Sequence, residues 1–187
     1  VALNGAPGSG RSTLLDEVVE ELERTGTTVL TVKGLPLLGS HPYIALEAVL
    51  PGPLSPQASP VDITDRLAKQ LYGQGDVVIA LDNIADIDHA SLGDQNQVHS
   101  RLNIPFVLTG DLDPTWAHDR ATRLTQRWIA TSISLSPIRY DQMAELLPAV
   151  LHGPVQDDLI SHVLTKSAGN PGLGKALALT ARLHGTI

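Results

Sequence analysis

The chain has 187 residues, enough for one domain with a small appendage and for a substantial hydrophobic core. Twenty acidic residues against thirteen basic ones give a formal net charge of −7, which argues against a broad nucleic-acid-binding face in this segment. The absence of cysteine excludes disulfides and thiolate metal sites, and no apolar run is long enough to predict a membrane span or a signal peptide.

Helical and strand-like segments alternate over most of the chain. Apolar residues at helical spacing predict the helices, and short β-branched or continuously apolar runs predict the strands. Gly26 ends the first helix, and a proline-rich loop over 51–60 precedes the third. In chain order we expect a helix over 10–24, a strand over 27–34, a helix over 42–50, a helix capped by Asp62 or Thr64 that runs to about 72, a strand over 76–83, a helix over 89–102, a strand over 104–110, a helix near 116–124 and a strand over 129–135.

This alternation predicts an α/β fold with a doubly wound parallel sheet and helices on both faces. After residue 137 the pattern changes to three amphipathic helices, over 139–151, 156–167 and 171–184, with no strand between them. We therefore expect a P-loop type α/β domain over 1–136 and a small helical lid over 137–187. Only four residues precede the glycine-rich loop, so we expect the chain to be a fragment of a longer protein.

The stretch "GAPGSGRST" has the spacing of a phosphate-binding loop between a strand and a helix. Small residues let successive backbone N–H groups turn toward phosphate oxygens at a helix N-terminus. An ordinary glycine-rich turn is the alternative, but the flanking strand and helix favour the phosphate loop. The predicted nucleotide-binding residues are Gly5, Ala6, Pro7, Gly8, Ser9, Gly10, Arg11, Ser12 and Thr13.

Arg11 occupies the position at which such a loop normally carries lysine. A guanidinium keeps the positive charge and binds phosphate in a bidentate manner, but it is longer and planar and cannot replace a compact ammonium. Loss of one well-placed charge costs on the order of a hundredfold or more in rate. The arginine therefore favours nucleotide binding with slow or absent hydrolysis.

A second motif supports the first. The apolar run "VVIALD" places Asp82 at the carboxyl edge of the sheet, where it could hold Mg²⁺ through the water shell of the metal, while Ser12 would place its hydroxyl on the ion. A buried strand that ends in an acid without binding anything is the alternative. Thr109 ends the next strand and could contact the γ-phosphate or the attacking water, although threonine is also common in strands for packing reasons.

Asn83 follows Asp82, where hydrolysing relatives of such a site often carry a carboxylate. An amide can position water but cannot accept a proton at neutral pH. We take Asn83 and Thr109 as the candidate catalytic residues, and we expect Asp86 and Asp88 to be solvated loop acids rather than general bases. The histidines show no metal-ligand spacing, and we expect Trp116 and Trp128 to be packing residues.

Five segments in order resemble the STAND class of P-loop ATPases, and most of all the ATPase module of large LuxR-type transcriptional regulators. They are "NGAPGSGRSTLL", "HPYIALEAVLPG", "VVIALDNIADIDHASL", "ISLSPIRYDQMAELL" and "SAGNPGLGKALAL". The resemblance covers essentially the whole chain. The chain departs from the family pattern at Arg11, Asn83 and Asp86.

The resemblance implies an AAA+-like sheet with a strand inserted between the two that carry the phosphate-site motifs, followed by a helical lid. It places Pro171 near the adenine or ribose, although "GNPG" is also explained as a helix cap followed by proline. It further implies an ATP/ADP switch with Mg²⁺ in a cytoplasmic regulator. The partners would be other domains of the same chain, a second copy, and DNA only through a domain outside this segment.

Two alternatives of other classes stay open. One is a scaffold that has kept the fold, has lost nucleotide binding and acts through protein–protein contacts. The other is a small-molecule kinase, which would require a substrate pocket and usually the loop lysine. The sequence carries no evident acceptor-binding signature.

Overall fold

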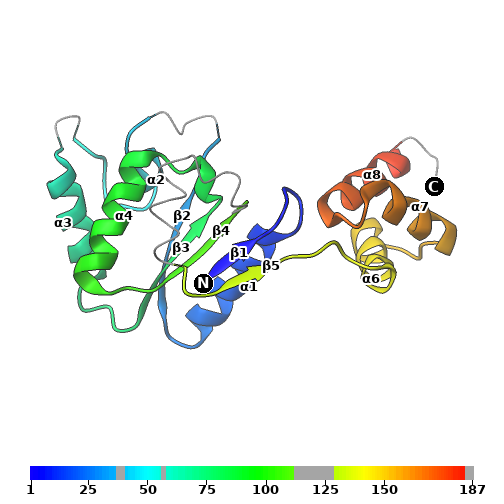
Figure 1. Ribbon diagram of the computed structural model, residues 1–187, viewed down its shortest axis with the longest axis horizontal. Helices are drawn as coiled ribbons and strands as arrows, with labels where there is room; N and C mark the ends of the chain where they lie inside the picture. Colours follow the sequence, from blue (N-terminus) through cyan, green and yellow to red (C-terminus); the bar gives the residue numbers. More distant parts are fainter. Residues whose placement is uncertain (37–40, 56–57, 112–128, 184–187) are drawn as a thin grey trace. The chain divides into compact units, whose positions relative to one another are not determined.

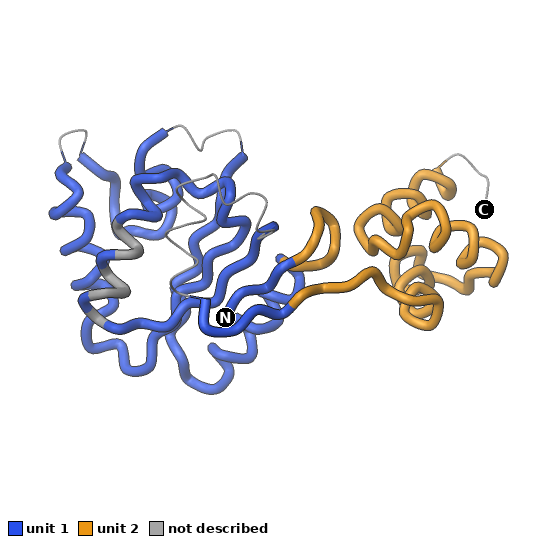
Figure 2. The backbone as a smooth tube through the Cα atoms, in the orientation of Figure 1, with its two compact units in different colours: residues 1–4, 12–133 blue, residues 5–11, 134–187 orange. Residues whose placement is uncertain are grey.

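The structure is a computed structural model that describes residues 1–36, 41–55, 58–111 and 129–183 (Figure 1). They form two compact units. Unit 1 comprises Val1–Asn4 and Ser12–Ile133, and unit 2 comprises Gly5–Arg11 and Ser134–Ile187 (Figure 2). The expected helix near 116–124, with Trp116 and Trp128, lies outside the described residues.

A five-stranded sheet forms the centre of unit 1, in the order β2-β3-β4-β1-β5. The pairs β2–β3, β3–β4 and β4–β1 are parallel, as the sequence predicts. The order confirms the inserted strand, because β4 lies between β1, which leads into the glycine loop, and β3, which ends in Asp82. The strands are β1 (Ala2–Asn4), β2 (Thr28–Lys33), β3 (Val77–Asp82), β4 (Phe106–Gly110) and β5 (Ser132–Ser134).

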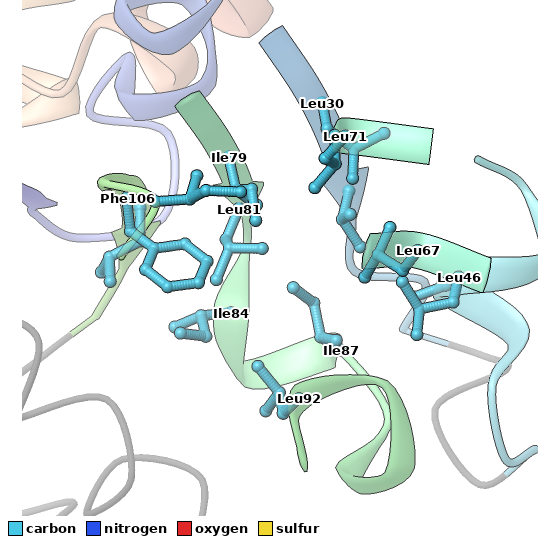
Figure 3. Close-up of a cluster of buried hydrophobic side chains, with 14 of the residues drawn as sticks. Leu30, Leu46, Leu67, Leu71, Ile79, Leu81, Ile84, Ile87, Leu92 and Phe106 are labelled. Carbon is cyan, nitrogen blue, oxygen red and sulfur yellow. The ribbon is translucent and has the colours of Figure 1, made fainter. Parts of the chain in front are cut away.

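Alternate residues of β1, β2, β3 and β4 face two different cores, which is why helices cover both sides of the sheet. The larger core contains Ile79, Leu81 and Phe106 from the strands and packs against α2, α3 and α4 (Figure 3). The smaller one contains Leu3 and Ala80 with Leu15 of α1. β5 is shorter than the predicted strand over 129–135, and its residues are exposed at the sheet edge.

The helices of unit 1 follow the amphipathic patterns with two exceptions. Their bounds are α1 (Arg11–Arg24), α2 (Ile44–Glu47), α3 (Pro60–Leu71), the 3-10 helix η1 (Ile84–Asp86) and α4 (His89–Leu102). One exception is the start of α3. Neither Asp62 nor Thr64 is its cap, because the Ser59 hydroxyl accepts a hydrogen bond from the Asp62 backbone N–H. Asp62 completes a capping box, and hydrogen bonds from Ser59 lower the pKa of its carboxyl.

The other exception is α2, which has one turn instead of the helix expected over 42–50. Tyr43, just before it, has a left-handed backbone with φ of 65°. The Asp88 carboxylate holds this start by accepting hydrogen bonds from the N–H groups of Tyr43 (2.8 Å) and Ala45 (3.2 Å). Hydrogen bonding to Asp88, which lies more than 40 positions later in the sequence, thus determines how this segment folds.

Asp88 is therefore not a solvated acid, as the sequence predicts, but a buried structural one with an exposed fraction of 2%. Besides Tyr43 and Ala45, it accepts hydrogen bonds from the backbone N–H and the hydroxyl of Ser91 at 2.9 and 2.7 Å. Its two oxygens thus join the start of α2 to the first turn of α4. A carboxylate that already accepts four hydrogen bonds is unsuited to general-base chemistry.

Unit 2 contains a three-helix bundle and the glycine loop. The helices are α6 (Tyr140–Leu151), α7 (Asp157–Ser167) and α8 (Pro171–Leu183), close to the predicted ranges. They bury Met143, Leu147, Ile160, Val163 and Ala178 at their centre. No helix in the described part of the chain is long and apolar enough to cross a membrane.

We expect Asp88→Asn to lower the free energy of unfolding by about 2 to 4 kcal/mol, because an amide cannot accept all four hydrogen bonds. Chemical denaturation of the purified chain measures this. The control is Asp65→Asn, which breaks an exposed ion pair with Arg101 and should cost less than about 1 kcal/mol. Equal losses in the two variants would contradict a structural role for Asp88.

Candidate functional site

Asp82 is the centre of the polar cluster at the carboxyl edge of the sheet. Its Oδ1 accepts hydrogen bonds from the hydroxyl groups of Ser12 (2.9 Å) and Thr109 (2.6 Å). The side chain is almost fully buried, with an exposed fraction of 7%. The structure thus brings together Ser12, Asp82 and Thr109, three of the residues that the sequence predicts to form the site.

Strand register explains why these residues meet. Leu81 of β3 pairs with Leu108 of β4, so Asp82 and Thr109 follow one residue later on the opposite face of the sheet. That face is covered by α1, whose Leu15 packs in the smaller core. Ser12 lies three residues before Leu15 and therefore on the same side of the helix. Packing of Leu15 directs the Ser12 hydroxyl toward Asp82.

Thr109 also orders the turn after β3. Its Oγ1 accepts a hydrogen bond of 2.8 Å from the Asn83 backbone N–H while it donates to Asp82. Asn83 has a left-handed backbone with φ of 54°, a conformation that asparagine tolerates better than most residues. Thr109 therefore links the end of β4 to the end of β3 through its single hydroxyl.

The Asn83 side chain is engaged with its own turn. Its Nδ2 donates a hydrogen bond to Asp86, which is half-buried rather than fully solvated. The same turn contacts the chain after β2, because the Leu35 N–H donates to the Asp86 carbonyl at 3.1 Å. The Asn83 side chain is thus bound to Asp86, whose backbone contacts the chain that follows β2.

The glycine loop of unit 2 has four successive carbonyl groups that each accept a hydrogen bond. In a trans peptide unit, the N–H points away from the carbonyl of the same unit. Each bound carbonyl therefore fixes the direction of the N–H in its own peptide unit, which is the case for the N–H groups of Ala6 and Gly8, whereas Pro7 has no N–H and that of Ser9 donates to Ala6. The carbonyls and their donors are Gly5 with Arg11 Nη1 (2.6 Å), Ala6 with the Ser9 N–H (3.1 Å), Pro7 with Asn170 Nδ2 (2.8 Å) and Gly8 with the Gly172 N–H (2.9 Å).

Arg11 thus braces the loop from within. Only one of its five N–H donors is used in the bond to the Gly5 carbonyl. The side chain is half-buried and carries a full positive charge.

Several features of the loop fit a phosphate group. Gly8 and Gly10 have φ of 82° and 93°, which permit the inward-turned backbone. The loop leads directly into α1, whose first N–H groups have no partner within the helix. The Ser9 hydroxyl oxygen is buried and, among the described residues, has no hydrogen-bond partner. Thr13 is exposed in the first turn of the helix.

The "GNPG" segment makes a contact that the sequence does not reveal. Asn170 caps α8, since its Oδ1 accepts a hydrogen bond of 2.9 Å from the Leu173 N–H, and Pro171 is the first helical residue. The same side chain donates to Pro7, 163 positions away. The cap predicted for this segment is present. Nothing in its local pattern indicates the contact with the loop.

Comparison with known proteins shows that the fold of this chain is similar to that of solved structures. No family model and no curated protein matches the sequence. Among solved structures, Cdc6p from Pyrobaculum aerophilum matches with a TM-score of 0.66 and 17% identity, over 99% of this chain and 56% of that one. The chain has the fold of AAA+ P-loop ATPases.

Two further structures show the same AAA+ likeness. Orc1 from Aeropyrum pernix, solved in complex with DNA, matches with a TM-score of 0.73 and 15% identity, over 98% of this chain and 55% of that one. The RuvB Holliday junction branch migration motor of Thermotoga maritima matches with 0.59 and 17%, over 97% and 53%. The chain spans little more than half the length of these proteins.

We expect Thr109→Val to lower the free energy of unfolding by about 1 to 3 kcal/mol, because Asp82 and the Asn83 N–H each lose a buried partner while the shape is kept. Thermal and urea unfolding measure the loss. Thr31→Val on β2 is the matched control, with an expected change below about 0.5 kcal/mol. A Thr109 variant as stable as wild type would mean that the hydroxyl does not join the two strands.

Proposed function

We propose that this chain binds ATP or ADP with Mg²⁺ and acts as the nucleotide-dependent switch module of a signalling ATPase. The observation that carries the proposal is the Ser12–Asp82–Thr109 cluster at the carboxyl edge of a parallel sheet, directly after a glycine loop. In open α/β sheets, ligands bind at the carboxyl ends of the strands. The AAA+ fold supports the same assignment.

The loop residues 5–13 would receive the phosphates through backbone N–H groups such as those of Ala6 and Gly8, whose peptide units are held by bound carbonyls, and through the first turn of α1. Ser12 and Asp82 supply the hard oxygen ligands that Mg²⁺ prefers. Bound magnesium would neutralise charge on the phosphate oxygens. Thr109 would hold the Asp82 carboxylate in place, and Pro171 would lie near the base, as the resemblance to the STAND class implies.

Arg11 would have two functions. One of its N–H groups holds the Gly5 carbonyl, and the others are available to phosphate oxygens. A guanidinium bound to the loop backbone is less free to follow charge as it moves between the β and γ phosphates. We therefore expect tight binding without efficient hydrolysis.

The residues around Asp82 also support slow or absent hydrolysis. The Asn83 amide cannot accept a proton, and its Nδ2 donates to Asp86. The buried Asp88 carboxylate is saturated by four hydrogen bonds. Long-lived nucleotide occupancy suits a switch better than a motor. A LuxR-type transcriptional regulator is the context that the sequence resemblance supports, with DNA binding and self-association supplied through other domains and copies.

We expect titration calorimetry with MgADP and MgATP to show saturable binding, and Arg11→Ala to weaken it by about tenfold to a hundredfold through loss of a charged donor. Arg11→Lys should stay within about fivefold of wild type because the charge is kept. Arg24→Ala is the control, since Arg24 lies at the far end of α1 and contacts Glu21. No heat and no thermal shift with either nucleotide would contradict the proposal and favour the scaffold alternative.

We expect the wild-type chain to release little or no inorganic phosphate from MgATP. The double variant Arg11→Lys with Asn83→Asp should raise the rate by about tenfold or more, because it supplies a mobile ammonium and a carboxylate. A phosphate-release assay under single-turnover conditions measures both rates. Rapid turnover by the wild type would contradict the assignment of a slow switch.

A further inference from the structure

Asn170 connects α8 to the glycine loop with one side chain. Its carbonyl oxygen accepts the Leu173 N–H, and its amide nitrogen donates to the Pro7 carbonyl. Of the small side chains that cap helices well, only the asparagine amide combines an acceptor with a donor of this reach. Serine and aspartate can perform the first task, but neither can perform the second.

Two glycines let the backbones approach next to this side chain. A Cβ on Gly172 would lie 2.9 Å from the Gly8 Cα, and a Cβ on Gly8 would lie 2.7 Å from Asn170 Oδ1. The Gly172 N–H, which has no acceptor within its helix, instead donates to the Gly8 carbonyl. The close approach and the hydrogen bonds therefore belong to one contact.

The backbone of Asn170 is itself fixed. Its N–H donates to the Ser167 carbonyl at 2.9 Å, and the Gly169 carbonyl accepts from the Ile138 N–H at 2.8 Å. Gly169 has φ of 74°, which the turn between α7 and α8 requires. The donor that reaches the loop thus projects from a rigid turn of the bundle.

We propose that Asn170 is a positioning residue for the phosphate loop, holding the Pro7–Gly8 peptide so that its carbonyl faces α8 and not the phosphate. This inference rests on the proposed function, because it concerns how the same loop receives a nucleotide. A flipped peptide would present its negative carbonyl end to the phosphate oxygens and remove an N–H donor. By thermodynamic linkage, a nucleotide that binds only this conformation of the loop also stabilises the contact between the loop and α8.

The test compares Asn170→Ser and Asn170→Ala with wild type in the 187-residue chain. Serine keeps the cap of α8 but loses the donor to Pro7, whereas alanine loses both. Circular dichroism and the thermal midpoint follow the cap. Amide hydrogen exchange across residues 5–13 without nucleotide follows the loop, and calorimetry with MgADP follows phosphate binding.

We expect Asn170→Ser to keep the wild-type helix content and thermal midpoint, while Asn170→Ala lowers the midpoint. In both variants the Ser9 amide should exchange roughly threefold to tenfold faster, and the Kd for MgADP should rise by a similar factor, as expected for one lost hydrogen bond. Gly172→Ala, which disturbs the same contact from the backbone side, should show the same two changes.

Wild-type exchange at Ser9 in Asn170→Ser, or faster exchange with an unchanged Kd, would overturn the proposal and leave nucleotide binding intact. If the wild type binds neither nucleotide, the proposed function fails. The phosphate-positioning role then fails with it, and the exchange data report only whether Asn170 holds the loop.

Discussion

One carboxylate oxygen connects the three segments on which the candidate site depends. Asp82 Oδ1 accepts the hydroxyls of Ser12 on α1 and Thr109 on β4 while its backbone ends β3. Buried acceptors with strong donors are costly to disturb, so this arrangement fixes the first turn of α1 against the sheet. The glycine loop continues in the chain directly into this anchored turn.

Much of this could be predicted from the sequence because the relevant signals are local. The apolar runs before Asp82 and Thr109 predict buried parallel strands, and the helical spacing around Leu15 predicts which side of α1 faces them. The alternation of buried side chains then sets the register between neighbouring strands. The agreement at Ser12 and Asp82 reflects periodicity and strand ends, both of which are readable without tertiary information.

The errors have a common physical origin. The sequence predicts a solvated Asp88 and a longer helix over 42–50 because the pattern of each segment carries no information about its distant partners. The buried Asp88 carboxylate accepts hydrogen bonds from the N–H groups of Tyr43 and Ala45, which lie 45 and 43 positions earlier in the sequence. This pairing overrides local propensity. Asn170 is a second example of a distant partner, with a larger separation in the sequence. Its cap is a local signal, whereas its bond to Pro7 has no sequence signature.

The separation between Pro7 and Asn170 has a consequence for how the protein is made. The loop is synthesised before its partner at the start of α8, which follows 163 positions later. At about 5 to 20 residues per second, that delay is on the order of ten seconds or more. The sheet can pair and α1 can dock in this interval, since the last strand of the sheet, β5, ends at Ser134. The glycine loop is thus made before the sheet is complete, but it acquires its full set of hydrogen bonds only after the start of α8 has been made.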